Sequence, residues 1–162
     1  MAQSIPSLVI KFLDNLNFPY EIINCKPEFA DTQKFCEIYG FNIENCGNTI
    51  IVASKKEPKK YSACIVKGSD RLNVNQKVRK LMEVSKVSFA SAEEALELTG
   101  MMIGGITPFA LPSNIPIYID KKIQNLENVI FGSGDRSSKV NISPEIFSKI
   151  QNAEFIEDLS IN

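Results

Sequence analysis

The sequence contains no histidine and no tryptophan. Without histidine neither a Ser-His-Asp triad nor a Cys-His pair can be assembled, so any chemistry must use carboxylates, lysines, hydroxyls, backbone amides or substrate groups. The cysteines form no C-x-x-C pair, and a structural zinc site would need all four to converge. We therefore expect buried, reduced thiols, and neither a metal nor a cofactor, at Cys25, Cys36, Cys46 and Cys64.

Long hydrophobic runs are also absent. No apolar run approaches the roughly 20 residues that a membrane-spanning helix needs. Residues 1–17 lack a basic start, and Lys11 and Asp14 interrupt their apolar positions, which is unlike a signal peptide. With 162 residues, 44% of them hydrophobic and 23% charged, the composition is that of an ordinary globular protein. We expect a single cytoplasmic domain over residues 1–162 and no membrane partner.

The net charge is only −1, but the basic residues are concentrated in one segment. Residues 55–86 carry a net charge of +7, and the rest of the chain carries −8. Such asymmetry suits a protein that meets a polyanion with one face, although a solvated, lysine-rich turn and helix would look the same. The densest group lies in the predicted hairpin connection and consists of Lys55, Lys56, Lys59 and Lys60.

Helical and extended patterns are interspersed without strict alternation, which predicts an α+β domain with a mixed sheet. Apolar periodicity and capping signals predict helices over residues 5–17, 31–39, 73–82, 91–99 and 143–150. The predicted N-terminal caps include Asp31, Asn73 with Gln76, and Ser91 with Glu94, and Gly40 and Gly100 are predicted to end helices. Short β-branched or apolar runs predict strands at 20–23, 49–53, 61–66, 86–89, 115–120, 129–131 and 139–142. The connection over residues 54–60 implies at least one antiparallel pair.

Residues 99–112 form an unusual apolar segment with three glycines and two prolines. Gly104 and Gly105 allow close approach of the backbone to a ligand, whereas Pro108 and Pro112 exclude a regular helix or a central strand. The segment is either a stiff pocket wall with exposed amides or a buried turn between core elements. If the amides face a pocket, Gly105→Val should weaken ligand binding more than stability.

Several short motifs occur in a fixed order, namely Thr99-Gly100, Gly104-Gly105-Ile106-Thr107-Pro108, Ile117-Tyr118-Ile119-Asp120 and Gly132-Ser133-Gly134. Together they resemble the YbaK-type aminoacyl-tRNA editing family, which also supplies the editing insertion of bacterial prolyl-tRNA synthetases. The resemblance covers nearly the whole chain. It implies a mixed, largely antiparallel sheet surrounded by helices, and hydrolysis of the ester that joins a wrong amino acid to tRNA. The implied partners are tRNA and an aminoacyl-tRNA synthetase, and not DNA.

The resemblance also implies roles for individual residues. The glycine loop would hold the aminoacyl group and stabilise an oxyanion through its amides, with Gly104 and Gly105 as catalytic groups. The position of the family's catalytic lysine falls on Asn48, which supplies an amide donor and acceptor but no charge. The remaining predicted substrate-binding residues are Ile106, Thr107, Pro108, Gly132, Ser133, Gly134 and Asp135.

The missing charge leaves two classes of function open. One is a divergent deacylase in which Asn48 orients the ester or water. The other is a non-catalytic binding module for an aminoacyl-tRNA end, a nucleotide or a protein partner. Lys67 and Lys86 are alternative sources of positive charge, but both also fit solvated strand ends. Three further charged residues stand near predicted pocket-forming turns, namely Asp120, Asp135 and Arg136.

Overall fold

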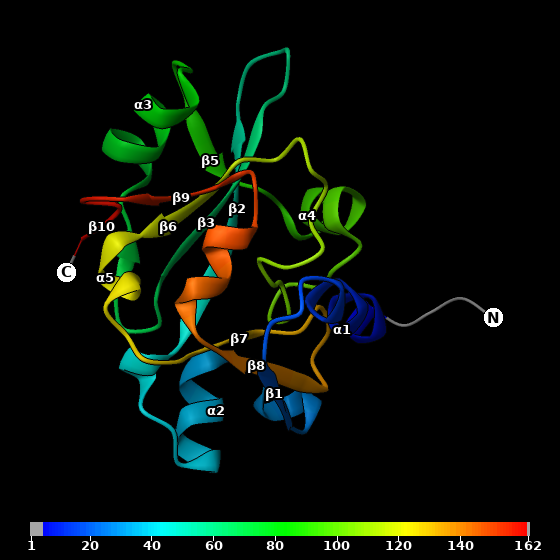
Figure 1. The fold of residues 1–162 in the computed structure, drawn as a ribbon. Coiled ribbons are helices and arrows are strands. Elements are labelled where there is room, and N and C mark those ends of the chain that lie inside the picture. The colour runs from blue at the N-terminus through cyan, green and yellow to red at the C-terminus, as the bar shows by residue number, and fades with distance from the viewer. Residues whose placement is uncertain (1–4, 162) are drawn as a thin grey trace.

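The computed structural model describes residues 5–161. Its central element is a five-stranded sheet in the order β5-β2-β3-β6-β9 (Figure 1). Strand β2 pairs antiparallel with β3 and β5, whereas β6 runs parallel to both β3 and β9. The bounds are β2 Gly47–Ser54, β3 Tyr61–Lys67, β5 Val87–Phe89, β6 Ile117–Asp120 and β9 Ala153–Ile156.

A second sheet of three strands packs beside the first and is antiparallel throughout, in the order β1-β8-β7. Its strands are β1 Tyr20–Asn24, β7 Val129–Gly132 and β8 Ser138–Ile142. A parallel bridge between Cys46 and Ile130 links this sheet to the residue that precedes β2. A short antiparallel pair, β4 Arg71–Leu72 with β10 Ser160–Ile161, completes the strands. The predicted mixed, largely antiparallel sheet is thus confirmed.

Helices surround the sheets (Figure 1). The α-helices are α1 Ile5–Asn15, α2 Thr32–Tyr39, α3 Arg79–Met82, α4 Ala92–Thr99 and α5 Lys121–Gln124. Short helices of other types are the 3-10 helices η1 Pro27–Phe29, η2 Ile43–Asn45 and η4 Pro144–Lys149, and the π-helical turn η3 Val74–Val78. Within residues 5–161, no helix has the length and apolar character that a membrane span requires.

The helix ends follow the predicted capping chemistry in some places and depart from it in others. The capping box of Ser91 and Glu94 is present, and Gly100 ends α4 with φ +74°. The predicted cap at Asn73 is wrong, because its side chain makes no capping bond and the segment begins as the π-helical turn η3. Asp31 occupies the N-cap position of α2, yet its carboxylate binds Arg136 instead of the helix amides.

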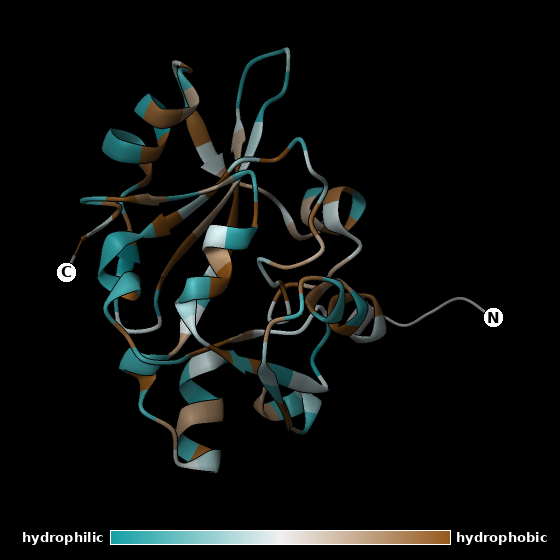
Figure 2. Cartoon of the chain, in the orientation of Figure 1, coloured by the Kyte–Doolittle hydropathy of each residue, from teal (hydrophilic) through white to brown (hydrophobic). Residues whose placement is uncertain are grey.

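Apolar side chains cover both faces of the five-stranded sheet. The larger cluster lies between this sheet, the second sheet and α1, and contains the rings of Phe109, Phe131 and Phe147. The ring centroids of Phe109 and Phe131 are 5.5 Å apart in an edge-to-face arrangement. The smaller cluster joins Val52, Val66 and their neighbours to η3 and α3. Figure 2 shows these apolar strands in brown and the hairpin loop beyond β2 in teal.

The two ends of β2 face different surroundings. Its first residues lie where the two sheets meet, beside β7. Its last residues lead into the β2–β3 hairpin, which projects from the molecule near α3 (Figure 1). The intervening strand rises by about 3.3 Å per residue, so the hairpin lysines lie roughly 20 Å from Asn48. Chemistry at one end of β2 is therefore physically separate from charge at the other.

Candidate functional site

A cavity of about 260 Å³ opens at the junction of the two sheets. Four segments that are distant in the sequence form its wall: the start of α2, the start of β2, the loop before Thr107, and the facing ends of β7 and β8. The lining residues are Asp31, Thr32, Gly47, Asn48, Thr49, Ile50, Ile103, Gly104, Ile106, Gly132 and Lys139. Asn48, Gly104, Ile106 and Gly132, four of the predicted site residues, thus meet at one cavity.

Asn48 is half-buried in the wall that β2 contributes. Its Oδ1 accepts a short hydrogen bond from the hydroxyl of Thr32 at the start of α2. The amide nitrogen of its side chain has no hydrogen-bond partner among residues 5–161 and remains available as a donor. The Thr32 bond fixes the orientation of the amide group, so the cavity has one positioned neutral donor at this point.

Residues 100–112, which follow α4, have no regular secondary structure, and the apolar side chains of this loop divide between core and surface. Met101 and Phe109 are fully buried, whereas Met102 and Ile103 are each 53% exposed. Gly104 has φ +93°, and its N–H makes no hydrogen bond within the described part of the chain. The Gly105 N–H instead donates to the carbonyl of Met102 at 2.9 Å. Of the two predicted amide donors, only Gly104 is unoccupied.

The glycine turn after β7 packs directly on this loop. The Gly134 N–H donates to the Gly105 carbonyl at 2.6 Å. A Cβ atom on Gly105 would lie 2.4 Å from the Asp135 carbonyl oxygen, and one on Gly132 would lie 2.6 Å from that of Ile106. These glycines therefore permit the close approach of two backbone segments, which shapes the cavity from behind.

The other predicted substrate-binding residues do not line the cavity. Thr107 and Pro108 are buried, and the Thr107 hydroxyl accepts a hydrogen bond from the Phe109 amide. Ser133 donates to the carbonyl of Ser138. The Asp135 carboxylate accepts hydrogen bonds from both the amide and the hydroxyl of Ser137, which closes a local turn.

Lys139 is a lining residue that the sequence analysis did not identify. It lies on β8 opposite Gly132 and is only 6% exposed. Its Nζ donates to the carbonyl of Ala30 at 2.6 Å and lies 5.6 Å from the centroid of the Phe35 ring. Burial lowers the pKa of the Lys139 ammonium below its ordinary value. The sequence does not indicate that Lys139 is buried, because a lysine in a strand usually lies on the exposed face.

An apolar cavity of about 240 Å³ adjoins the first and shares Thr49, Ile50, Ile103, Gly104 and Ile106 with it. Its remaining wall comes from Ile51, Phe89, Ala90 and Ala95. The hydroxyl oxygen of Thr49 is buried and has no partner within residues 5–161. The two cavities thus share part of their wall, and they are called below the polar compartment and the apolar compartment.

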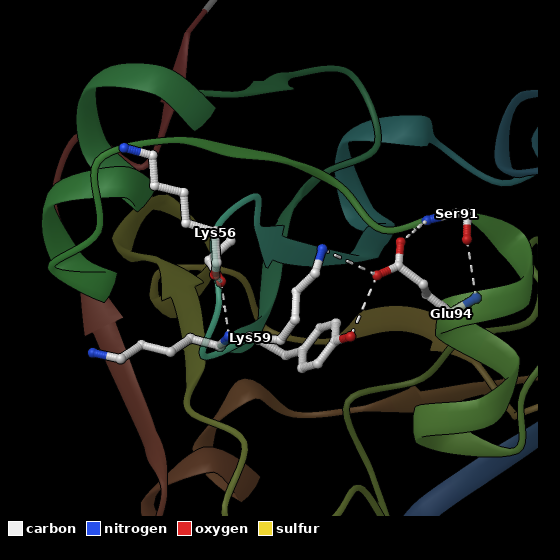
Figure 3. Close-up of polar contacts among 7 residues, drawn as sticks. Lys56, Lys59, Ser91 and Glu94 are labelled. Carbon is white, nitrogen blue, oxygen red and sulfur yellow. Dashed lines mark hydrogen bonds and ion pairs between the residues drawn. The ribbon is translucent and has the colours of Figure 1, made fainter.

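The four predicted tRNA-binding lysines lie at the other end of the sheet. All are exposed, and Lys59 and Lys60 border a separate cavity of about 390 Å³ that also contains Tyr61 and Tyr118. Lys59 approaches Glu94 at 3.8 Å, and the Tyr61 hydroxyl donates to the same carboxylate at 3.3 Å (Figure 3). The Lys56 side chain extends away from this cluster (Figure 3).

The remaining charged candidates are placed outside the first cavity. Neither Lys67 nor Lys86 lines it. Asp120 is buried at the end of β6 and caps α5 through the Lys122 amide. Arg136 donates to the Pro27 carbonyl and, at 3.0 Å, to Asp31, so it fastens the segment before α2 to the turn after β7.

Two of the thiols near the site have a raised pKa. Cys46 and Cys36 are buried with their sulfur atoms 3.4 Å apart, and burial raises the pKa of Cys46 to about 12. Burial also raises the pKa of the half-buried Cys25. All four cysteines are free, as expected, although Cys25 is only partly buried.

The fold and the pocket define the chain as a mixed-sheet domain with a glycine-loop cavity. The chain belongs to the aminoacyl-tRNA editing domain family, which matches residues 26–150. The resemblance inferred from the motifs is thereby confirmed.

Individual relatives and a solved structure agree with this assignment. The uncharacterized protein YwhH of Bacillus subtilis is 29% identical over 115 residues, covering 66% of this chain and 73% of YwhH. A proposed Cys-tRNA(Pro)/Cys-tRNA(Cys) deacylase of Enterococcus faecalis, EbsC, is 24% identical over 57% of this chain and 56% of its own length.

The proline–tRNA ligase of Streptococcus uberis is 24% identical over 81% of this chain, which spans 20% of the ligase. A crystal structure of a protein proposed as a trans-editing enzyme for prolyl-tRNA synthetase superposes with a TM-score of 0.83. It has 18% identity and covers 100% of both chains. At this identity the superposition demonstrates a shared fold.

Proposed function

We propose that this protein hydrolyses the ester of a mischarged aminoacyl-tRNA and acts in trans. The observation that carries the proposal is the convergence of Asn48, Gly104 and Gly132 on one cavity in a chain of the editing-domain family. The relatives described as a deacylase and as a proline–tRNA ligase support tRNA and a synthetase as partners.

In this proposal the polar compartment receives the ester and the apolar compartment receives the amino-acid side chain. Water adds to the ester carbonyl carbon and produces a tetrahedral oxyanion. The bond to the ribose oxygen then breaks, and that oxygen takes the proton from the attacking water, so a free amino acid and an intact tRNA hydroxyl result. The Gly104 N–H and the Asn48 side-chain amide are the unoccupied neutral donors for the oxyanion.

The test is a deacylation assay over a panel of mischarged tRNAs, with the wild type and Asn48→Ala. Removing one preorganised oxyanion donor typically lowers the rate by about 10²–10³-fold, and we expect a loss of that size. The matched control is Asn45→Ala, in η2 and outside the cavity, which should leave the rate unchanged. A wild type that hydrolyses nothing across the panel would refute the proposal.

One observation favours the alternative of a non-catalytic binding module. The Oδ1 atom of Asn48 is already bound to Thr32, as expected of a residue that joins β2 to α2. In that case Asn48→Ala would bind a tRNA end as the wild type does, and no hydrolysis would be detected. Binding without turnover in both proteins would identify this second function.

A further inference from the structure

The inference concerns Lys139, whose ammonium group is buried without a carboxylate partner. None of the ion pairs formed within residues 5–161 includes Lys139. The neighbouring Asp31 binds Arg136 at 3.0 Å. A buried charge is normally paired, because desolvation of an ammonium without a counter-charge is costly. The carbonyl of Ala30 and the ring of Phe35 compensate only part of that cost.

The position of Lys139 indicates where the missing counter-charge belongs. An ammonium has three donors, and the Ala30 carbonyl uses one. Lys139 lines the same cavity as Asn48 and Gly104, and the wall of that cavity already carries two neutral donors. The carboxylate at this cavity, Asp31, is exposed and neutralised by Arg136. The polar compartment therefore has the chemistry of an anion site.

We propose that Lys139 is the anion-binding group of this pocket and supplies, from β8, the positive charge that Asn48 does not supply from β2. This proposal rests on the proposed function and extends it to a further residue. A negatively charged oxygen at the 3′ end of an aminoacyl-tRNA has two sources. One is the oxyanion that forms when water adds to the ester, and the other is the phosphate of the terminal nucleotide.

The first experiment compares kcat and KM of the wild type, Lys139→Gln and the exchange variant Asn48→Lys with Lys139→Asn. Glutamine retains a donor for the Ala30 carbonyl without the charge. If Lys139 stabilises the oxyanion, kcat should fall about 100-fold in Lys139→Gln with little change in KM. The exchange variant returns a lysine to the same cavity and should recover at least about tenfold of that loss. Lys11→Gln, which removes one exposed lysine of α1, is the matched control.

The second experiment needs no catalysis and identifies the phosphate source. Calorimetry measures binding of 3′-alanylamido-3′-deoxyadenosine with and without a 5′-phosphate, because its amide resists hydrolysis. If Lys139 binds the phosphate, the phosphate should increase affinity about tenfold or more in the wild type and not in Lys139→Gln. This measurement decides the role of Lys139 even if the wild type proves inactive on every tRNA, which would refute only the proposed function.

Two results would overturn the proposal. In the first, Lys139→Gln has wild-type kcat and KM, and the phosphate effect is the same in both proteins. In the second, Lys139→Gln and Lys139→Met both fail to fold by circular dichroism, which would assign Lys139 a structural role in holding Ala30 and Phe35.

Discussion

Lysines lie near both ends of strand β2, in the hairpin loop that follows it and on β8 beside its start, and the two groups differ in their surroundings. At the hairpin end, Lys55, Lys56 and Lys60 are exposed and have no ion-pair partner in the described part of the chain, while Lys59 approaches Glu94. At the pocket end, Lys139 is buried beside a carbonyl and an aromatic ring. The same side chain is therefore solvated in one region and desolvated in the other.

This difference determines what each region can contribute. Exposed charges act over a distance limited by salt, about 10 Å at 0.1 M ionic strength, and they are suited to a polyanion backbone. A buried charge is screened much less and acts on groups that it touches. The hairpin end is thus suited to affinity for tRNA, and the pocket end to the chemistry of its terminus.

The largest expected effect comes from Gly105→Val, which disrupts the pocket end. Its Cβ would lie 2.4 Å from the Asp135 carbonyl, so two backbone segments would have to separate. The sequence alone predicted a loss of binding larger than the loss of stability. From the structure we expect Gly105→Val to lose both ligand binding and stability, with a decrease of about 3 kcal/mol in the free energy of unfolding. Urea denaturation measures this decrease.

Gly40→Ala is the control for this substitution. Gly40 has φ +78°, which disfavours other residues, but no atom lies within 4 Å of the position that its Cβ would take. It should destabilise by about 1 kcal/mol and leave activity intact. Equal destabilisation by both variants would contradict the close packing of the two loops.

The next effect concerns the hairpin end, where Lys55, Lys56, Lys59 and Lys60 are all replaced by glutamate. Affinity for tRNA should fall about tenfold or more at low salt, because the variant makes fewer contacts with phosphates and therefore releases fewer counterions on binding. The slope of log affinity against log salt should become shallower, and amino-acid preference should not change. Filter binding at several salt concentrations measures both, and an unchanged slope would mean that these lysines are merely solvated.

The smallest effect is a pH dependence that distinguishes the buried lysine from the exposed ones. Burial lowers the pKa of Lys139 in the folded state, whereas the unfolded chain titrates near 10.4. Between those values the unfolded state binds more protons, so stability rises with pH in that window. The Tm of the wild type should therefore increase relative to Lys139→Gln from pH 7 to pH 10.5. A Tm difference that does not change with pH would show that burial does not destabilise the charged form of Lys139.

Local signals in the sequence predicted most of the fold. The Ser91–Glu94 capping box, the left-handed Gly40 and Gly100, and the β2–β3 hairpin all follow from residues close in sequence. The cap at Asn73 failed because its side chain makes no bond to the following amides and the chain takes a π-helical turn. Asp31 failed as a side-chain cap because a distant residue, Arg136, binds it.

The site was predictable only in part, because some of its residues are positioned by contacts with distant parts of the chain. Gly104, Ile106 and Gly132 stand in motifs, and Asn48 falls on the position of the lysine that the resemblance implies, so the sequence identified these four residues as candidates. Lys139 stands in no motif, and its burial depends on Phe35 and Ala30, about a hundred positions earlier. Interactions between remote segments leave no local pattern, and the partners of Asp31 and Lys139 are of that kind.

The bridge between Cys46 and Ile130 has a consequence for the order of folding. It closes a chain loop of about half the protein, and contacts of such sequence separation form late because loop closure must precede them. Folding during synthesis generally proceeds from the N-terminus. Because Gly132 and Lys139 line the cavity, its wall stays incomplete until residue 139 has left the ribosome, even in a chain that already contains Asn48 and Gly104.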